Sequence, residues 1–352
     1  MKTGNRKTKL LTLTLAAGVL ASPGLSLLPA DYAAAASTKY TIAQQPFNIK
    51  GSKQNIGTIN KNGSTYIALR NLNTALGLTT KFNNSTQMIQ VIGKNRVMEI
   101  SLRNNTTQLN GQPLAGLQPI SQDYTTYLPL RFLLENLGYD VTYQQGTKLI
   151  GIEAIQENDL KIQTEVIGAD GDGKSLSVFY PVISGYSNNA VQQKINTFLK
   201  QEIDKQVSAA SKQMTQAATD DRQLSFDGGY TVQYNEKGKL SLTMDYYIYL
   251  GGAHGEPIRV PYTFDLATGA VLSLKDVVQD SKDYVAIINK NIKAQVKSRQ
   301  VPLQVPFETI KADRNFFLNR SGVVIYFEPY EYTSFADGMP QFVIPYSAFE
   351  QK

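Results

Sequence analysis

The stretch that decides how the second half of this chain folds is Tyr246-Tyr247-Ile248-Tyr249-Leu250-Gly251-Gly252-Ala253-His254-Gly255-Glu256-Pro257. It places three glycines around His254, the only histidine among 352 residues, and it separates two strand-like runs at 240–250 and 258–266. Glycine adopts positive φ and lets another backbone or a ligand approach closely. The stretch is therefore either a plain hairpin connection or a recognition loop that presents His254 and main-chain amides.

The runs around this stretch predict an antiparallel sheet covered by a long helix. Strands are expected at 160–167, 175–180, 230–235, 240–250 and 258–266. The helix follows the hairpin made by the first two strands. It is expected to begin near Ser187 or Asn188, because either side chain can cap its N-terminus. Apolar residues then recur at helical spacing, namely Val191, Ile195, Phe198, Ile203, Val207 and Met214. We expect this stripe to pack across the sheet.

The C-terminal part adds a second helix and further strands. Apolar residues on one side of 282–297 predict the helix, and alternating runs at 322–327, 328–332 and 341–346 predict strands. Helices and strands are mixed without a βαβ rhythm. The fold class is therefore α+β, with a mostly antiparallel sheet and two helices in the larger domain.

The first third of the chain contains an internal repeat. The run Tyr66-Ile67-Ala68-Leu69-Arg70 aligns with Tyr127-Leu128-Pro129-Leu130-Arg131, an offset of 61 residues (70 to 131). The same offset carries Lys81-Phe82 onto Thr142-Tyr143 and Val91 onto Ile152. One register held through strand, helix and strand indicates a duplicated α+β unit. Each copy has a strand, a two-turn helix that ends at Gly77 or Gly138, and two more strands.

This paired pattern of Tyr-x-x-Leu-Arg, helix and Leu-Gly resembles the copper amine oxidase N-terminal-like domain, a duplicated module of exported proteins. The resemblance covers residues 40–155 and implies a stalk or an envelope-adhesion module. It does not extend to copper chemistry, because such a site needs several imidazoles and His254 lies outside the module. Arg70 and Arg131 either brace the strand-to-helix corners or grip an anionic polymer.

The N-terminus has the pattern of a secretory signal peptide. Basic residues up to Lys9 precede an apolar run at 10–20, and small residues follow as far as Ala36. The apolar run is about half the roughly 20 residues that a membrane-spanning helix requires. We expect cleavage after Ala36, no transmembrane segment in the mature chain, and an extracellular, cell-wall-associated product.

Charge and cysteine content narrow the choice of partners. Without residues 1–36 the chain has 31 basic and 28 acidic residues, so most of its basicity belongs to the leader. Binding of nucleic acid is therefore not expected. The absence of cysteine excludes disulfides and acylation of a lipoprotein cysteine. This composition suits an exported protein of a Gram-positive bacterium.

Five motifs in the last two thirds form a second pattern. They are Tyr180-Pro181-Val182-Ile183-Ser184-Gly185, Tyr249-Leu250-Gly251-Gly252-Ala253-His254-Gly255, Phe264-Asp265-Leu266-Ala267-Thr268-Gly269, Tyr326-Phe327-Glu328-Pro329-Tyr330-Glu331-Tyr332 and Phe342-Val343-Ile344-Pro345-Tyr346. Together they resemble a pair of domains found in lysozyme-sensing anti-sigma factors and in the non-catalytic front half of a peptidoglycan deacetylase. The resemblance covers residues 160–349 and implies an extracytoplasmic domain that, in the sensors, binds lysozyme. The sensors' cytoplasmic segment and membrane helix, and the deacetylase's catalytic domain, have no expected counterpart here.

These patterns predict four segments. They are a signal peptide at 1–36, the duplicated module at 37–156, a deacetylase-front-half-like subdomain at 157–262 and a lysozyme-receptor-like subdomain at 263–352, with the seam between module and subdomains at Glu157-Asn158-Asp159.

Catalytic chemistry has few candidate residues. One histidine without cysteine cannot supply a zinc or copper site, and no serine lies on a Gly-x-Ser-x-Gly elbow. Paired carboxylates for glycoside hydrolysis remain an alternative, with Asp245 and Glu256 or Glu328 and Glu331 as the pairs. A purely structural spacer is a further alternative.

The main prediction is a non-enzymatic binding protein without a cofactor. Its partner is expected to be a lysozyme-like muramidase, or peptidoglycan or an anionic wall polymer. The 20 tyrosines, several of them bunched, either form an aromatic contact surface or pack on the sheet faces. The expected ligand-binding residues are Gly251, Gly252, His254, Gly255, Glu328, Tyr330, Glu331, Tyr332 and Asp337. The acidic members would complement a basic partner.

Overall fold

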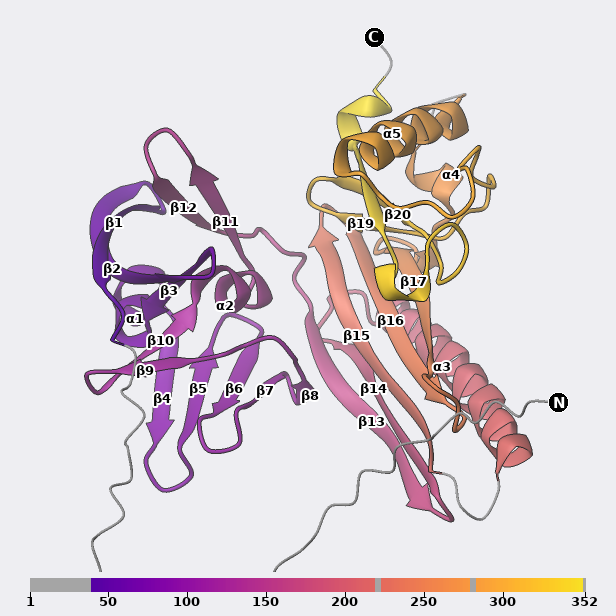
Figure 1. The fold of residues 1–352 in the computed structure, drawn as a ribbon, viewed down its shortest axis with the longest axis horizontal. Helices are drawn as coiled ribbons and strands as arrows, with labels where there is room; N and C mark the ends of the chain where they lie inside the picture. Colours follow the sequence, from indigo (N-terminus) through magenta and orange to yellow (C-terminus); the bar gives the residue numbers. More distant parts are fainter. Residues whose placement is uncertain (1–38, 219–222, 279–282, 351–352) are drawn as a thin grey trace, which may run out of the picture. The chain divides into compact units, whose positions relative to one another are not determined.

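A computed structural model describes residues 39–218, 223–278 and 283–350, without the side chains of residues 72–75. The predicted signal peptide at 1–36 lies outside these residues. The described part mixes helices with mostly antiparallel sheets (Figure 1), which confirms the α+β class.

The duplicated module contains two sheets and two short helices. Its elements are β1 (Ile42–Ile49), β2 (Ser52–Lys61), β3 (Ser64–Ala68), α1 (Leu69–Leu76), β4 (Thr79–Asn83), β5 (Met88–Ile92), β6 (Val97–Ser101), β7 (Thr106–Leu109), β8 (Gln112–Pro113), β9 (Ile120–Gln122), β10 (Thr125–Pro129), α2 (Leu130–Asn136), β11 (Tyr139–Gln144) and β12 (Leu149–Ala154). One sheet has the order β11-β12-β1-β2-β3-β10-β9 and the other β4-β5-β6-β7-β8. The repeat is confirmed element by element, since β3, α1, β4 and β5 correspond to β10, α2, β11 and β12.

The two copies meet along β3 and β10. These strands pair antiparallel with Ile67 opposite Leu128, and the offset of 61 residues makes these two residues equivalents of each other. The neighbouring pair Tyr127 and Ala68 is likewise the counterpart of Tyr66 and Pro129. Ile67 and Leu128 are almost completely buried in the module's main core. A local two-fold axis therefore passes through this pair of strands.

The second part is built on a long, twisted sheet. Its elements are β13 (Lys161–Gly171), β14 (Lys174–Ser184), α3 (Asn189–Ala217), β15 (Leu224–Glu236), β16 (Lys239–Tyr249), β17 (Glu256–Asp265) and β18 (Ala270–Val271). The strands lie in chain order, and all neighbours are antiparallel except β14 and β15. Helix α3 lies along this sheet (Figure 1), and the Asn188 side chain caps it by accepting the N–H of Val191. The stripe buried by α3 is Val191, Ile195, Leu199, Ile203, Ala210 and Met214.

The C-terminal part adds a three-stranded sheet and two helices. Its elements are α4 (Leu274–Val277), α5 (Tyr284–Arg299), β19 (Phe316–Asn319), β20 (Gly322–Tyr326) and β21 (Gln341–Pro345), with 3-10 turns at Phe335–Asp337 and Tyr346–Ala348. The expected strand at 328–332 was wrong, because this segment is a turn in which Tyr330 has a φ of 63°. Strand β19 and the one-turn helix α4 were not predicted.

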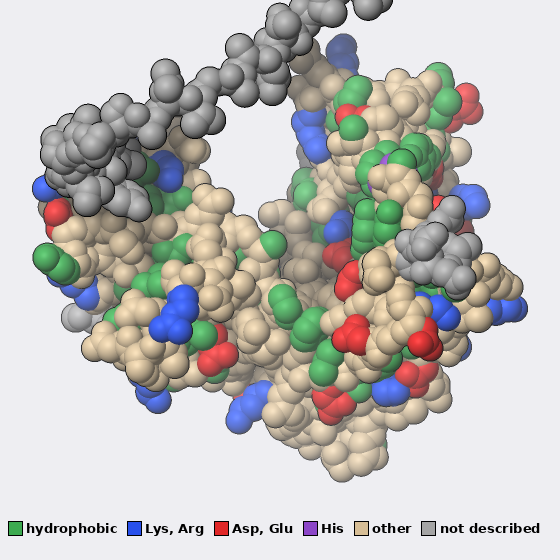
Figure 2. Space-filling model, turned by 60° about the horizontal axis from the view of Figure 1, so that its bottom comes forward, with side chains coloured by type: hydrophobic (Ala, Val, Ile, Leu, Met, Phe, Trp, Pro, Cys, Tyr) green, Lys and Arg blue, Asp and Glu red, His purple; other side chains and the backbone are tan. Residues whose placement is uncertain are grey.

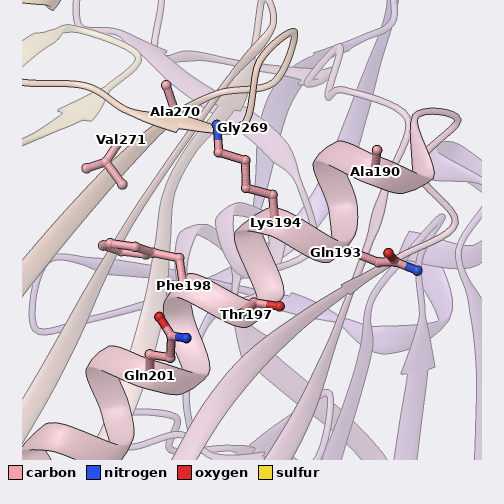
Figure 3. A pocket seen from close by; sticks show the side chains of 9 residues that line it. All are labelled: Ala190, Gln193, Lys194, Thr197, Phe198, Gln201, Gly269, Ala270 and Val271. Carbon is pink, nitrogen blue, oxygen red and sulfur yellow. The ribbon is translucent and has the colours of Figure 1, made fainter.

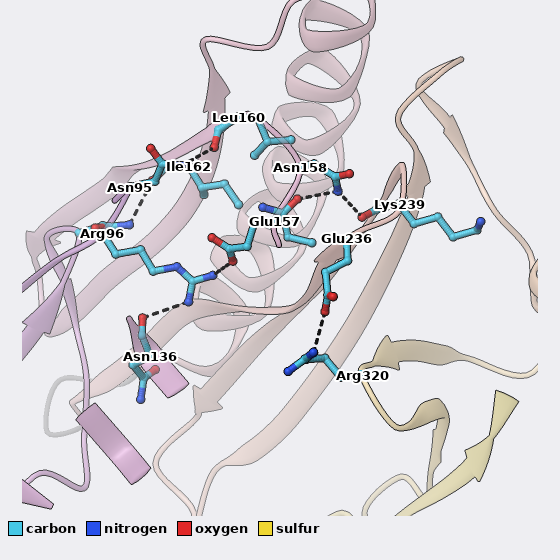
Figure 4. A network of polar contacts seen from close by, with 12 residues as sticks. Asn95, Arg96, Asn136, Glu157, Asn158, Leu160, Ile162, Glu236, Lys239 and Arg320 are labelled. Carbon is cyan, nitrogen blue, oxygen red and sulfur yellow. Dashed lines mark hydrogen bonds and ion pairs between the residues drawn. The ribbon is translucent and has the colours of Figure 1, made fainter. Parts of the chain in front are cut away.

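The segment at 157–160 carries a network of polar contacts (Figure 4). Asn158 donates from its amide to the side chain of Asn235 and to the carbonyl of Lys239, each at 2.9 Å. Glu157 pairs with Arg96, and burial raises the pKa of the Glu157 carboxyl against the effect of that arginine. The predicted domain bounds stay predictions. The boundary expected between residues 262 and 263 falls inside strand β17.

We expect Leu128→Ala to lower the free energy of unfolding by about 2–5 kcal/mol, because it leaves a cavity beside Ile67 at the junction of the two copies. Urea unfolding followed by circular dichroism measures this change. The control is Ile42→Ala, whose side chain is exposed on β1 and whose loss should change stability by about 0.5 kcal/mol or less. Equal losses in the two variants would contradict the assignment of Leu128 to a junction core.

Candidate binding site

Near its C-terminal end, strand β16 has one face in the core and one face exposed to solvent. Tyr246 and Ile248 are buried in the same core as the stripe of α3. Tyr247 lies between them in sequence, so it points to the opposite face, where it is exposed. In the β15–β16 register Tyr247 stands opposite Asp227, which is also exposed. The sheet face turned away from α3 thus carries an aromatic side chain and a carboxylate side by side.

The glycine-rich loop closes against this face. The phenol oxygen of Tyr247 accepts the N–H of Gly255 at 2.7 Å. A Cβ atom at Gly255 would lie 2.5 Å from the carbonyl oxygen of Ile248 and 2.6 Å from the ring of Tyr247. Only glycine fits so close an approach. The loop is therefore a hairpin connection that presents His254, and Gly252, Ala253 and His254 are all exposed.

The structure brings this loop together with the segment at 328–338. The imidazole of His254 stacks on the ring of Phe335, with centroids 4.0 Å apart and planes 22° apart. The phenol of Tyr330 lies 3.2 Å from Nε2 of His254, and its ring is 5.9 Å from that of Phe335. Figure 2 shows the histidine, in purple, among hydrophobic side chains. We call Tyr247, His254, Tyr330 and Phe335 the aromatic patch.

An ion pair holds the irregular segment that carries Tyr330. The guanidinium of Arg314 forms two hydrogen bonds to the carboxylate of Glu331 and a third to the carbonyl of Tyr326. Glu331 also accepts the N–H of Glu328 at 2.9 Å. Burial alone would lower the pKa of Arg314, but the hydrogen bonds and charge of Glu331 outweigh it and raise that pKa. Glu331 thus supports the loop from beneath.

The other expected site residues have different surroundings. Tyr332 packs against Phe307 and Phe327 in the C-terminal core. Asp337 is exposed and accepts hydrogen bonds from the N–H and hydroxyl of Ser334, which closes the 3-10 turn beneath Phe335. Gly251, with a φ of 78°, makes the first bend of the glycine-rich loop. Loop residues therefore divide into those that face solvent and those that fix the loop.

Of the four carboxylates considered for catalysis, Asp245 and Glu331 are in ion pairs, Glu328 lies close to the pair of Glu331, and Glu256 is exposed on β17. Asp245 forms two hydrogen bonds, of 2.6 and 3.1 Å, with Arg259. The Arg259 guanidinium lies 5.6 Å from the ring centroid of Tyr326, whose hydroxyl donates to the carbonyl of Arg259. Burial raises the pKa of the Tyr326 phenol. This cluster ties β16 and β17 to β20.

Sequence reasoning missed Phe335, Arg314 and Arg259. Phe335 was within reach, because it is the only aromatic residue in the polar, small-residue run from Ser334 to Gly338. The two arginines gave no signal, since their partners lie 14 and 17 residues away along the chain.

A second hollow lies along α3 (Figure 3) and is lined by Ala190, Gln193, Lys194, Thr197, Phe198, Gln201, Gly269, Ala270 and Val271. Its single charged group, the ammonium of Lys194, donates to the carbonyl of Thr268 at 3.0 Å. The ring of Phe198 packs edge-on against Tyr262 and Phe264. This hollow thus belongs to the packing of α3.

Within the described residues, no group of three or more histidine, cysteine or carboxylate side chains could hold a metal ion.

Three family models match this chain. The copper amine oxidase N-terminal domain matches residues 47–152, the deacetylase PdaC model residues 169–256, and the protein of unknown function DUF3298 residues 275–347. The chain therefore resembles, in order, the two families that its motifs indicated, and the aromatic patch draws Tyr247 and His254 from the second match and Tyr330 and Phe335 from the third.

Two curated relatives from Bacillus subtilis are similar to parts of the chain. The peptidoglycan-N-acetylmuramic acid deacetylase PdaC is 27% identical over 34% of this chain and 25% of its own length. The anti-sigma-V factor RsiV is 25% identical over 51% of this chain and 65% of its own length. The chain spans less than two thirds of either relative. These similarities relate it to domains of cell-envelope proteins.

Solved structures give a likeness of fold only. A DUF3298-family protein of Pseudomonas aeruginosa is 17% identical, with a TM-score of 0.41, over 54% of this chain and 91% of that one. A second member from Bacteroides fragilis is 16% identical, with a TM-score of 0.39, over 54% of this chain and 93% of that one.

Among the helices of the described ranges, none has the length and apolar character to cross a membrane.

Replacing the carboxylate beneath the patch should destabilise the C-terminal part. We expect Glu331→Gln to lower the free energy of unfolding by about 3 kcal/mol, because Arg314 keeps its charge and loses its counter-charge in a largely buried site. Urea unfolding measures the change. Glu135→Gln is the control, since it breaks the exposed pair with Arg131 and should cost less than about 1 kcal/mol. A loss at Glu331 no larger than the loss at Glu135 would contradict a supporting role.

The stability contributed by Glu328 should depend on pH. Burial raises the pKa of the Glu328 carboxyl, against hydrogen bonding from Tyr326 and the charge of Arg314. The folded chain then holds this proton more tightly than the unfolded chain, so the associated stability is present below the unfolded pKa and is lost as pH rises through the folded pKa. The side chain of Glu328→Gln cannot ionise, so this variant does not lose that stability. The urea midpoint of the variant, minus the midpoint of the unmodified protein, should therefore increase between about pH 4 and pH 7. A difference between the two midpoints that does not change with pH would contradict this assignment.

Proposed function

We propose that this chain is a secreted, non-enzymatic cell-envelope protein of a Gram-positive bacterium that binds a lysozyme-type muramidase through the aromatic patch. The observation that carries the proposal is the meeting of two segments, 251–255 and 328–338, which are far apart in the sequence. Their side chains stack and hydrogen-bond at the surface through His254, Tyr330 and Phe335. The resemblance to lysozyme-sensing anti-sigma factors and the similarity to RsiV agree with this class of partner.

The patch has the composition of a protein-binding hot spot. Tyr330 is 60% exposed although its ring is held by contacts with His254 and Phe335. Rigid aromatic side chains contribute large contact areas at a low cost in conformational entropy, and they are enriched at the centres of interfaces. Because Arg314, Glu331 and the turn at Phe335–Asp337 fix the loop, binding needs little further ordering of the chain.

Carboxylates around the patch favour a basic partner. Asp227 stands opposite Tyr247, Glu256 follows the glycine-rich loop directly, and Asp337 lies in the turn that carries Phe335. All three are exposed. Negative charge at the rim of an aromatic centre steers a positively charged protein and speeds its association. We therefore expect the affinity for a basic lysozyme to fall as the salt concentration rises.

A binding role also agrees with the state of the carboxylates considered for hydrolysis. Asp245 is paired with Arg259, and Glu331 with Arg314. A general base must reach the proton that it removes, and a carboxylate with both oxygens on a guanidinium has little capacity left for that task. The proposed protein therefore acts through its surface.

The test is calorimetric titration of residues 37–352 with hen lysozyme. We expect binding, and we expect Tyr330→Ala and Phe335→Ala each to weaken it by about tenfold or more, as for aromatic residues at the centre of an interface. Tyr124→Ala is a matched control: Tyr124 is also an exposed tyrosine with a left-handed backbone, with a φ of 56°, but it lies in the turn between β9 and β10 of the module. Its loss should leave the affinity unchanged.

Two outcomes would count against the proposal. The first is no heat of binding with lysozyme while purified peptidoglycan fragments bind, which would indicate a wall-adhesion protein. The second is lysozyme binding that neither aromatic substitution weakens, which would move the contact to another surface.

A further inference from the structure

The duplicated module contains a large groove that the proposed function does not use. It measures about 1050 Å³ and is bordered by β1, the turn between β2 and β3, the corner between β10 and α2, and the hairpin of β11 and β12. The strands among these elements belong to the seven-stranded sheet. In this sheet β12 pairs with β1, and β10 pairs with β3, two strands further on. A groove of this size is in the range of small-molecule and oligomer sites.

The groove arises from a difference between the two copies. In the second copy, β12 pairs in parallel with β1, with Phe47 opposite Ile150, so the hairpin extends the sheet. In the first copy, the equivalent strand β5 pairs with β6 instead. Each hairpin has one exposed aromatic residue, and its surroundings differ between the two copies. Tyr143 lines the groove, whereas its counterpart Phe82 stands on the other sheet and is not among the lining residues.

Seven of the twenty residues that line the groove have an amide or aliphatic hydroxyl side chain. The amide and hydroxyl groups along the groove come from Gln44, Gln45, Asn60, Ser64, Thr65, Gln118 and Thr142. Amide side chains carry both donors and acceptors, and hydroxyls serve as either. Gln45 donates to the carbonyl of Lys148, and the hydroxyl of Thr65 donates to Asn60 at 3.0 Å, so both strand ends are held in place.

Charge in the groove is nearly balanced. Arg131 pairs with Glu135 at 2.6 Å, which leaves Lys148 as the remaining charged residue among those lining it. A polymer with a phosphate on every unit would meet too little positive charge for tight binding. The pair joins two residues of α2, and the two interpretations of Arg131 stay open.

Aromatic surface completes the groove. Tyr143 is 54% exposed, and Phe132 of α2 also lines the groove, with its ring 3.3 Å from the position that a Cβ of Gly116 would take. Exposed rings offer flat apolar surface beside the amides, which suits ligands that have both apolar faces and many hydroxyl groups.

We propose that this groove binds a linear glycan whose sugars carry hydroxyl and acetamido groups. The ring of Tyr143 would contact the apolar face of one sugar, and the amides of Gln44 and Asn60 would pair with its acetamido group. The site lies apart from the aromatic patch in sequence and shares no residue with it. The protein would therefore hold a glycan with its first third while its last third binds a protein.

The test is calorimetric titration of residues 37–352 with chitohexaose, an oligomer of N-acetylated amino sugars. We expect binding, a loss of about tenfold or more in Tyr143→Ala, and unchanged affinity in Phe82→Ala. Phe82 is the matched control, because it occupies the equivalent position of the first copy with a similar exposure of 51%. Cellohexaose, which lacks the acetamido group, should bind at least tenfold more weakly than chitohexaose.

Several results would overturn the proposal. They are no binding of chitohexaose, equal losses in Tyr143→Ala and Phe82→Ala, or binding of polyglycerol phosphate alone. Circular dichroism of both variants shows whether each one is folded. Tyr330→Ala should bind chitohexaose as the unmodified protein does, so failure of the glycan site and failure of the lysozyme site are distinguishable.

Discussion

The packing of one face of β16 on α3 is the constraint on which the proposed protein-binding site depends. Tyr246 and Ile248 enter the core with Ile195, Leu199 and other residues of the helix stripe. Since side chains alternate along a strand, burial of these residues forces Asp245 and Tyr247 to the other face. Asp245 then reaches Arg259, and Tyr247 supports Gly255. These two contacts, which position the glycine-rich loop and β17, follow from which face of β16 is buried.

A second constraint orders the irregular part of the C-terminal domain. The segment from Phe327 to Pro340 forms no strand and can make few ladder hydrogen bonds. Arg314 binds both carboxylate oxygens of Glu331 in this segment and the carbonyl of Tyr326 just before it, while Tyr332 anchors the segment in the aromatic core around Phe327. Interior contacts thus hold the backbone, and Tyr330 and Phe335 are left to face outward. Loops with such internal support present side chains with little conformational freedom.

The regular elements could be predicted because local patterns determine them. The repeat with its offset of 61 residues predicted β3, α1, β10 and α2, and the spacing of apolar residues predicted α3. Of the two caps predicted for α3, Ser187 and Asn188, the cap is Asn188. Tyrosine packing on the sheet is confirmed for Tyr246, which is buried, whereas Tyr247, next to it on the strand, is exposed, and an aromatic contact surface stays a prediction. Alternation misled at 328–332, because Tyr330 adopts a left-handed backbone and an ion pair with distant Arg314 outweighs strand propensity there. The meeting of His254 with Phe335 depends on tertiary contacts that no local pattern encodes.

The pairing of β3 with β10 has a consequence for how the module is assembled. Ile67 pairs with its own counterpart in the repeat, Leu128. The local two-fold axis relates the neighbouring pair Ala68 and Tyr127 to the pair Pro129 and Tyr66. In a symmetric dimer, a residue i of one subunit contacts j of the other while j contacts i, and β3 with β10 reproduces that arrangement within one polypeptide. A single copy could bury this strand only by associating with a second molecule. Covalent linkage of the copies makes the association independent of protein concentration, and it frees the two hairpins to differ, so that one of them could shape a groove.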